Sequence, residues 1–201
     1  MADDVFYMKQ ALIEAQKAAD RGEVPVGAVV VCRDRIIARS HNLTETLNDV
    51  TAHAEMQAIT AAANTLGGKY LNECTLYVTV EPCVMCAGAI AWAQTGKLVF
   101  GAEDDKRGYQ RYAPDALHPK TVVVKGILAD DCAQLMKDFL KKKKKKKTPP
   151  PVKRGFIVLD TFVIYKVISI FMLFVGRMAF SLYFFPFFGI DGREKCVGFL
   201  F

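Results

Sequence analysis

The first 140 residues of this 201-residue chain lack any excess of positive charge. They carry 14 Lys and Arg against 18 Asp and Glu, whereas residues 141–201 carry 13 Lys and Arg against three Asp and Glu. The net charge of +6 therefore comes from the C-terminal end of the chain. It does not indicate a generally basic, nucleic-acid-binding surface on the main part, where any basic patch must be local.

The N-terminus also lacks the features of a secretory signal peptide. Asp3 and Asp4 stand where such a peptide has Lys or Arg, and no continuous apolar segment follows them. We therefore expect a cytoplasmic protein that is not exported. In such a protein the six cysteines are better explained as buried thiols and metal ligands than as a disulfide framework.

Apolar patterns predict helices that alternate with short strands after an initial hairpin. Helices are expected at residues 3–20, 54–66, 84–94 and 130–140. Strands are expected at residues 26–32, 36–38, 74–80, 98–100 and 121–124, with a hairpin turn at 33–35. This order predicts an α/β domain with three layers, α/β/α, around a central mixed sheet.

The composition changes abruptly near residue 140. Seven consecutive lysines at 141–147 are followed by Thr148 and three prolines, and residues 148–201 contain 11 of the 14 phenylalanines. No clear helical or alternating period is visible in this last segment. We therefore place the main domain at residues 1–147 and expect residues 148–201 to be a hydrophobic tail without a defined fold.

A membrane anchor is the main alternative for this tail. A spanning helix needs about 20 apolar residues with few charges, but the uncharged run 167–176 is ten residues long and ends at Arg177. An arginine at the centre of a span costs at least about 2.5 kcal/mol on insertion scales. The lysine run implies an adenine-rich coding stretch where reading frames slip, so the tail also resembles an arbitrary translation. Membrane binding is not expected, although the alternative stays open.

Two short motifs carry the residue types of a metal centre. His53 and Glu55 stand at the start of one predicted helix, and Cys83 and Cys86 follow Pro82 at the start of another. Cysteines at positions i and i+3 lie on one helical face, so both sulfurs can reach one ion. With one His nitrogen they leave a fourth tetrahedral position for water, as a catalytic zinc requires. We therefore predict zinc ligands at His53, Cys83 and Cys86, with Glu55 free to carry protons.

Other uses of the Cys83–Cys86 pair remain open from the residues alone. A closed structural zinc site would take a fourth ligand from another cysteine: Cys32, Cys74 or Cys132. A thioredoxin-like redox pair would fit the strand–CxxC–helix order, but it would leave the motif at 53–55 as a coincidence. A non-catalytic zinc-binding module would use the same ligands without turnover.

Together, the two motifs resemble the signature of the zinc nucleobase deaminases. Within that superfamily the chain resembles the bacterial tRNA-specific adenosine deaminases, at residues 22–28, 41–42, 51–55, 77–90 and 100–102. The resemblance covers nearly all of residues 1–146 and excludes the tail. It implies a cytidine deaminase-like fold, a homodimer, and hydrolysis of the wobble adenosine in the anticodon loop of a tRNA to inosine.

The resemblance also implies roles for particular residues. His53, Cys83 and Cys86 would hold zinc, and Glu55 would take a proton from the zinc-activated water, deliver it to N1 of the adenine, and assist the departure of ammonia. Asn42 would hydrogen-bond the purine, although the residues alone favour a turn residue after a strand, and only the resemblance reverses that preference.

Two further positions would shape the base pocket if the resemblance holds. The backbone around Ala54 would line the pocket, and Val26 would pack on the base. The alternative for Val26 is an ordinary place in the core of a strand. His41 and His118 are not needed for the reaction, and His118 is expected in a loop.

The nearest competing function is deamination of a free purine such as guanine at the same kind of metal site. A tRNA enzyme needs basic residues at the rim of its pocket to bind phosphates. Lys106, Arg107 and Arg111 are the candidates, although Asp104 and Asp105 beside them dilute the charge. An ordinary solvated loop is the alternative explanation for this segment.

Overall fold

The computed structural model describes residues 2–147 of the chain. The predicted domain boundary after residue 147 falls at the end of the described residues, and the predicted tail at 148–201 lies outside them. Both stay predictions. Within residues 2–147, no helix is long and apolar enough to cross a membrane.

Five strands form one mixed sheet in the order β2-β1-β3-β4-β5. They are β1 (Gly27–Cys32), β2 (Arg35–His41), β3 (Cys74–Val80), β4 (Lys97–Ala102) and β5 (Val122–Lys125). β1 pairs antiparallel with β2 and β3, whereas β4 runs parallel to β3 and to β5. The β1–β2 hairpin turns at Arg33 and Asp34, whose φ values of 49° and 59° are left-handed, as the twist of a tight hairpin requires.

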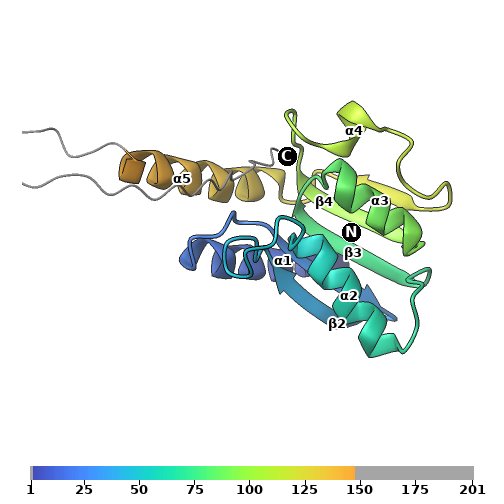
Figure 1. Cartoon of the computed structure of the whole chain (residues 1–201). Coiled ribbons are helices and arrows are strands. Elements are labelled where there is room, and N and C mark those ends of the chain that lie inside the picture. The colour runs from blue at the N-terminus through green and yellow to red at the C-terminus, as the bar shows by residue number, and fades with distance from the viewer. Residues whose placement is uncertain (1, 148–201) are drawn as a thin grey trace, which may run out of the picture. The chain divides into compact units, whose positions relative to one another are not determined.

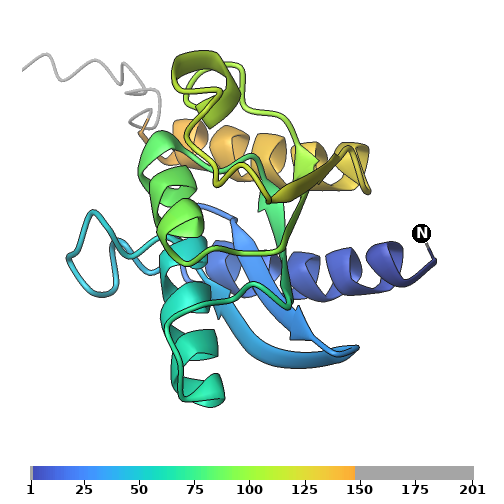
Figure 2. The same cartoon turned by 90° about the vertical axis from the view of Figure 1, so that its right-hand side faces the viewer.

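Helices cover both faces of this sheet (Figure 1 and Figure 2). α1 (Ala2–Asp20) and α5 (Ala129–Lys147) pack on one face, and α2 (Ala54–Leu66) and α3 (Val84–Trp92) pack on the other. A single short turn of helix, α4 (Tyr109–Tyr112), follows β4. The predicted three-layer α/β/α class is therefore confirmed.

The central strands divide their side chains between two cores. Val29 and Val31 of β1 join Tyr7 and Met8 of α1 in one cluster, while Val30 packs in the other cluster with α2 and α3. Because both faces of the sheet are buried around β1, that strand lacks an alternating polar pattern, which explains why its sequence is a continuous apolar run.

The last helix is longer than the sequence pattern predicts. The pattern predicts an end near Leu140, but α5 continues through the lysine run to Lys147. Lysine has a good helix propensity, and cations at a helix C-terminus interact favourably with the helix dipole. The apolar pattern marks only the part of α5 that packs on the sheet, where Cys132 lies against Gly101 of β4. The short helix α4 was not predicted either.

The topology brings distant segments together at one edge of the sheet. β3 and β4 end there, and α2 and α3 begin there, as Figure 1 shows. β1 starts and β2 ends at the same edge, because β1 runs antiparallel to both β2 and β3. Carboxyl ends of parallel strands are the usual place for a site in open α/β sheets.

Candidate metal centre and substrate cavity

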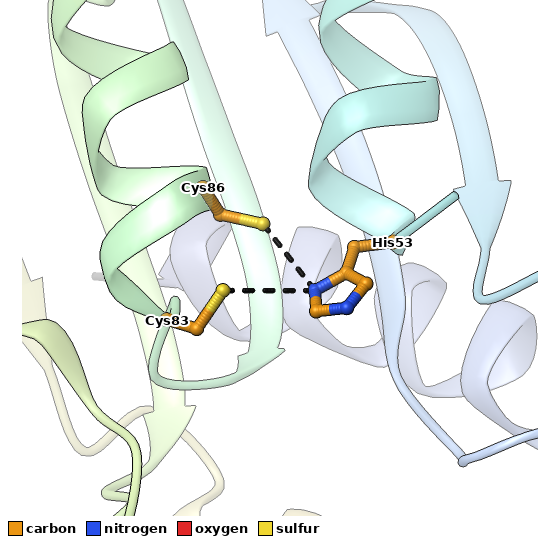
Figure 3. A group of neighbouring side chains, drawn as sticks. All are labelled: His53, Cys83 and Cys86. Carbon is orange, nitrogen blue, oxygen red and sulfur yellow. Dashed lines mark hydrogen bonds between the residues drawn. The ribbon is translucent and has the colours of Figure 1, made fainter. Parts of the chain in front are cut away.

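His53, Cys83 and Cys86 point toward one another across the gap between α2 and α3 (Figure 3). The Nδ1 atom of His53 lies 3.7 Å from the sulfur of Cys83 and 3.5 Å from that of Cys86. Their possible ligand atoms all lie within 4.8 Å of one another. The structure thus brings together the three residues that the motifs predicted as metal ligands.

Two of the three candidate ligands are N-cap residues. His53 occupies the N-cap position of α2 and Cys83 occupies that of α3, and both have extended backbone angles. Neither side chain is used to cap its own helix, so both remain available for another partner. Cys86, one turn further along α3, is buried and faces the same point. The positive ends of both helix dipoles therefore favour negative charge here.

The two thiols differ strongly in acidity. Their mutual hydrogen bond lowers the pKa of Cys83 to about 4, with His53 adding to the effect. The same hydrogen bond, together with burial, raises the pKa of Cys86. The pair therefore accepts one negative charge readily and resists a second, and a divalent cation between the sulfurs would offset that cost. This donor set fits Zn²⁺.

Glu55 is a fully buried carboxyl group beside this cluster. Burial raises the pKa of Glu55 to about 7. Its Oε2 atom has no hydrogen-bond partner among the described residues, which is unusual for a buried carboxylate oxygen. His53 lies two residues away, and its hydrogen bond to Cys83 raises its own pKa. A buried carboxyl with a pKa near neutrality and an unused oxygen suits a proton carrier.

The other described cysteines lie away from the cluster. Cys32 and Cys74 face each other across β1 and β3, and Cys132 packs on β4 in the opposite core. Within residues 2–147, the group that could hold a metal contains three side chains and no fourth cysteine. The geometry therefore favours an open metal site over a closed structural one. It also argues against a redox pair of Cys83 and Cys86, because such a pair would not explain why His53 lies in contact with both sulfurs.

The metal cluster opens into a cavity of about 230 Å³. Val26, Asn42, His53, Glu55 and Cys83 line it, so five of the predicted site residues share one space. Ala54, in contrast, packs in the hydrophobic core, and its carbonyl accepts a hydrogen bond from Ser40. The predicted contribution of the Ala54 backbone to base binding stays a prediction.

The basic residues predicted at the rim divide into two groups. Lys106 and Arg107 are exposed and border a groove that also contains Cys83, and Arg107 lines the substrate cavity as well. Arg111 instead donates to the backbone carbonyl of Asp105 at 2.6 Å and lies over the ring of Tyr112. The structure therefore brings Lys106 and Arg107 to the candidate site and turns Arg111 toward its own loop.

Comparison with known proteins decides the family. A family model described as "MafB19-like deaminase" matches residues 2–144. A curated tRNA-specific adenosine deaminase of Bacillus subtilis is 45% identical over 146 residues, which cover 70% of this chain and 91% of the relative. The chain belongs to the tRNA-specific adenosine deaminase family. A member from Agrobacterium fabrum is 42% identical and is covered over 96% of its length.

Solved structures agree with this assignment. A structure from a study of A-to-I editing by tRNA A34 deaminases matches with a TM-score of 0.61 and 43% identity, over 65% of this chain and 98% of that one. The guanine deaminase of Nitrosomonas europaea matches with a TM-score of 0.57 and 26% identity, over 66% of this chain and 82% of that one. The three-layer fold is thus shared with other deaminases.

Sequence reasoning missed several residues around the site of this deaminase. Met136 of α5 lines the substrate cavity, although the residue is about 50 positions or more from either metal motif. Glu23 and Glu81 are buried acids that hold the loops beside the cavity. Both acids lie in stretches that resemble the deaminase family, at residues 22–28 and 77–90, but no local pattern assigned them a role.

A larger cavity of about 680 Å³ lies at the opposite end of the hairpin, near Cys32 and Cys74. An exposed ion pair of 2.7 Å between Arg33 and Glu73 borders it. It includes no histidine and no group of candidate metal ligands among the described residues. The candidate site of this deaminase is therefore chosen by donor chemistry and not by the size of its cavity.

Proposed function

We propose that this chain converts the wobble adenosine of a tRNA anticodon to inosine by hydrolysis, with Zn²⁺ held by His53, Cys83 and Cys86. The observation that carries the proposal is the three-ligand cluster that shares a cavity with the buried carboxyl of Glu55. Membership of the tRNA-specific adenosine deaminase family supports the choice of substrate.

When bound by His53, Cys83 and Cys86, zinc would supply Lewis acidity that lowers the pKa of a water toward about 7. Glu55 would take a proton from the attacking water through its Oε2 atom and deliver it to N1 of the adenine as the water oxygen bonds to C6. The carboxylate would then take the remaining proton from the new C6 hydroxyl and give it to the exocyclic amine, which leaves as ammonia when the C6–N bond breaks. The raised pKa of Glu55 lets it both accept and release a proton near neutral pH.

Asn42 and Val26 would position the base in the cavity. Asn42 is buried, and its side-chain amide is fixed by Glu23 and Thr44, so its remaining oxygen can accept a hydrogen bond without further ordering. Val26 offers an apolar surface to one side of the ring. The adenosine must leave its stack to reach the cavity, which a single-stranded anticodon loop permits at low cost.

We propose that Lys106 and Arg107 bind phosphates of the anticodon loop. Both are exposed at the mouth of the site. The ion pairs of the described part of the chain involve other side chains, so both cations are available. A free-base deaminase has no need for such residues, which favours tRNA over guanine.

We propose that the enzyme acts as a homodimer in the cytoplasm. Trp92 at the end of α3 is 86% exposed, and Val84 and Met85 at its start are also exposed. Tryptophan and methionine are enriched in protein–protein interfaces, and an exposed apolar helix face is costly in water. A second copy of this chain on α3 would cover these side chains.

A deamination assay tests the proposed function. The full chain, loaded with zinc, is incubated with tRNA carrying adenosine at the wobble position, with free adenosine and guanine as parallel substrates. We expect inosine in the tRNA and no comparable turnover of the free compounds. Turnover of guanine alone would assign the chain to free-base deamination, and no turnover at all would favour a zinc-binding module.

A further inference from the structure

Glu81 is a buried acid that the proposed reaction does not use. It follows β3 directly and precedes Pro82 and the metal-ligand candidate Cys83. One carboxylate oxygen accepts a hydrogen bond from the backbone N–H of Asp104, and the other accepts one from the backbone N–H of Gln110, both at 3.0 Å. Both oxygens are thus used to hold a different segment of the chain.

The segment held in this way, the 103–110 loop, comprises the connection from β4 to α4 and the first two residues of α4. Its C-terminal part is pressed onto the carboxylate, because a Cβ atom added to Gly108, the N-cap of α4, would clash with the carboxyl atoms of Glu81. Gly108 also pairs with Cys83 in an isolated β-bridge, and the N–H of Tyr109 donates to the carbonyl of Pro82. The loop is therefore fixed directly to the segment that carries the metal ligand.

Between the two anchor points, the same loop carries Lys106 and Arg107. Their backbone N–H groups are held by the side chain of Asp104, while their own side chains are exposed. Asp104 is in turn one of the two residues that Glu81 holds. Glu81 thus helps to hold the backbone from which both cations extend.

We propose that Glu81 is a positioning residue for the nucleic-acid substrate: it holds the 103–110 loop so that Lys106 and Arg107 reach phosphates next to the target adenosine. The inference rests on the proposed tRNA function and adds a determinant of affinity to it. Glu81 borders the substrate cavity, but both of its carboxylate oxygens accept hydrogen bonds from the loop. It acts through the loop, by two backbone hydrogen bonds and one close contact.

The sign of the effect separates positioning from simple electrostatics. Replacing Glu81 with Gln removes one negative charge close to an RNA-binding surface, and charge alone would tighten RNA binding. The same replacement turns one acceptor oxygen into an NH2 group, which cannot accept a hydrogen bond from the backbone N–H of Asp104 or Gln110. One of the two hydrogen bonds that hold the loop is therefore lost. Positioning therefore predicts weaker binding, in the opposite direction.

The experiment measures binding of a synthetic anticodon stem–loop RNA, with adenosine at the wobble position, to the zinc-loaded full chain carrying Glu55→Gln to prevent turnover. Affinity is recorded against salt concentration, with and without Glu81→Gln. We expect on the order of tenfold weaker binding and a salt slope that is shallower by about 0.7 for each phosphate that the loop no longer binds. Glu103→Gln is the matched control, since Glu103 is an exposed acid of the same loop paired with Lys125.

A second background tests whether Glu81 acts through the two cations. In a chain that already carries Lys106→Gln and Arg107→Gln, the Glu81 replacement should weaken binding little further. The proposal is overturned if Glu81→Gln leaves RNA binding equal or tighter in the chain that retains Lys106 and Arg107. It is also overturned if Glu81→Gln weakens binding by the same factor in the chain that lacks both cations. A parent chain that does not bind the stem–loop at all would instead refute the tRNA function.

The interaction can also be disturbed from the loop side. Gly108 has a φ of −58°, which alanine adopts without strain, so Gly108→Ala adds only a methyl group against the Glu81 carboxylate. It should weaken RNA binding in the same direction with zinc content unchanged. If the Glu81 variant does not fold, this replacement becomes the deciding one, and an unchanged affinity overturns the proposal.

Discussion

The amide nitrogen of Asn42 donates a hydrogen bond of 3.1 Å to a carboxylate oxygen of Glu23, a side chain with no solvent exposure. The same nitrogen donates to the hydroxyl of Thr44 at 2.9 Å. Both of its protons are thus used, and the amide is held in one orientation. Its oxygen then becomes the atom of Asn42 that can accept a hydrogen bond from the substrate.

We predict that Asn42→Ala lowers deamination without disturbing the metal. The replacement removes the proposed acceptor for the purine and leaves Glu23 with its other donors. Removing a hydrogen bond to a bound substrate costs about 0.5–1.5 kcal/mol, or about two- to tenfold in activity. Steady-state kinetics on tRNA together with zinc analysis check this, and full activity would make Asn42 a structural residue of the loop.

Glu23 should make the stability of the enzyme sensitive to acid. Burial alone would raise the pKa of Glu23, but hydrogen bonds from the backbone N–H groups of Thr46 and Glu45 outweigh it and hold the pKa below its ordinary value of 4.5. A lowered folded-state pKa contributes stability that is present above 4.5 and is lost as pH falls through the folded value.

At pH 7 we therefore expect Glu23→Gln to lower the free energy of unfolding by about 1–3 kcal/mol, since a buried acceptor of several donors is removed. The difference from the parent should shrink as the pH is lowered below 4.5. Denaturant titrations at several pH values measure it. A difference that is independent of pH would mean that packing, rather than the charge, is responsible.

Glu55→Gln should retain the fold and the metal while turnover is lost. The amide has nearly the same shape, but it cannot accept and return a proton. Loss of such a group typically costs about 10²- to 10⁴-fold, and more where one group performs both transfers. Single-turnover inosine formation and metal analysis are the measurements, and near-normal turnover would remove Glu55 from the mechanism.

Trp92→Asp should convert the proposed dimer into a monomer. A charged side chain at a buried apolar interface is strongly unfavourable, whereas the exposed position in the single chain tolerates it. Sedimentation velocity measures the change. Gln16→Asp on the exposed face of α1 is a matched control for the added charge. A variant that remains dimeric would place the interface elsewhere.

Truncation after Lys147 should leave deamination of tRNA intact. All the described site residues lie before this point, and Met136 is the last residue that lines the cavity. The truncated chain retains the whole of α5. We expect unchanged kcat/KM and an unchanged melting temperature. Loss of activity or of folding would make residues 148–201 a working part of the enzyme.

Local patterns in the sequence were sufficient for much of the fold. The bounds predicted for α2 and β3 match those observed, because alanine-rich helices closed by glycine and buried apolar strands have strong local signals. The grouping of His53, Cys83 and Cys86 was also predictable, since the i and i+3 spacing of the two cysteines places them on one helical face.

The supporting hydrogen bonds were not predictable, because they join residues that are distant in the sequence. The N–H donors to Glu23 lie 22 and 23 residues away, and the donors to Glu81 lie 23 and 29 residues away. Nothing in the local sequence distinguishes a buried acid that holds a loop from an acid on the surface. The end of α5 escaped prediction for another reason, because an unpacked helix has no apolar period.

Two of the three proposed metal ligands, His53 and Cys83, stand at the starts of two different helices, and this arrangement would give bound zinc a second consequence. An ion bound by His53 of α2 and by both cysteines of α3 cross-links the two elements that cover one face of the sheet. A ligand that binds only the folded state stabilises it by mass action, by about 1.4 kcal/mol for each tenfold rise in free ligand above its dissociation constant. Resistance of the enzyme to unfolding and degradation should therefore follow the zinc supply of the cell.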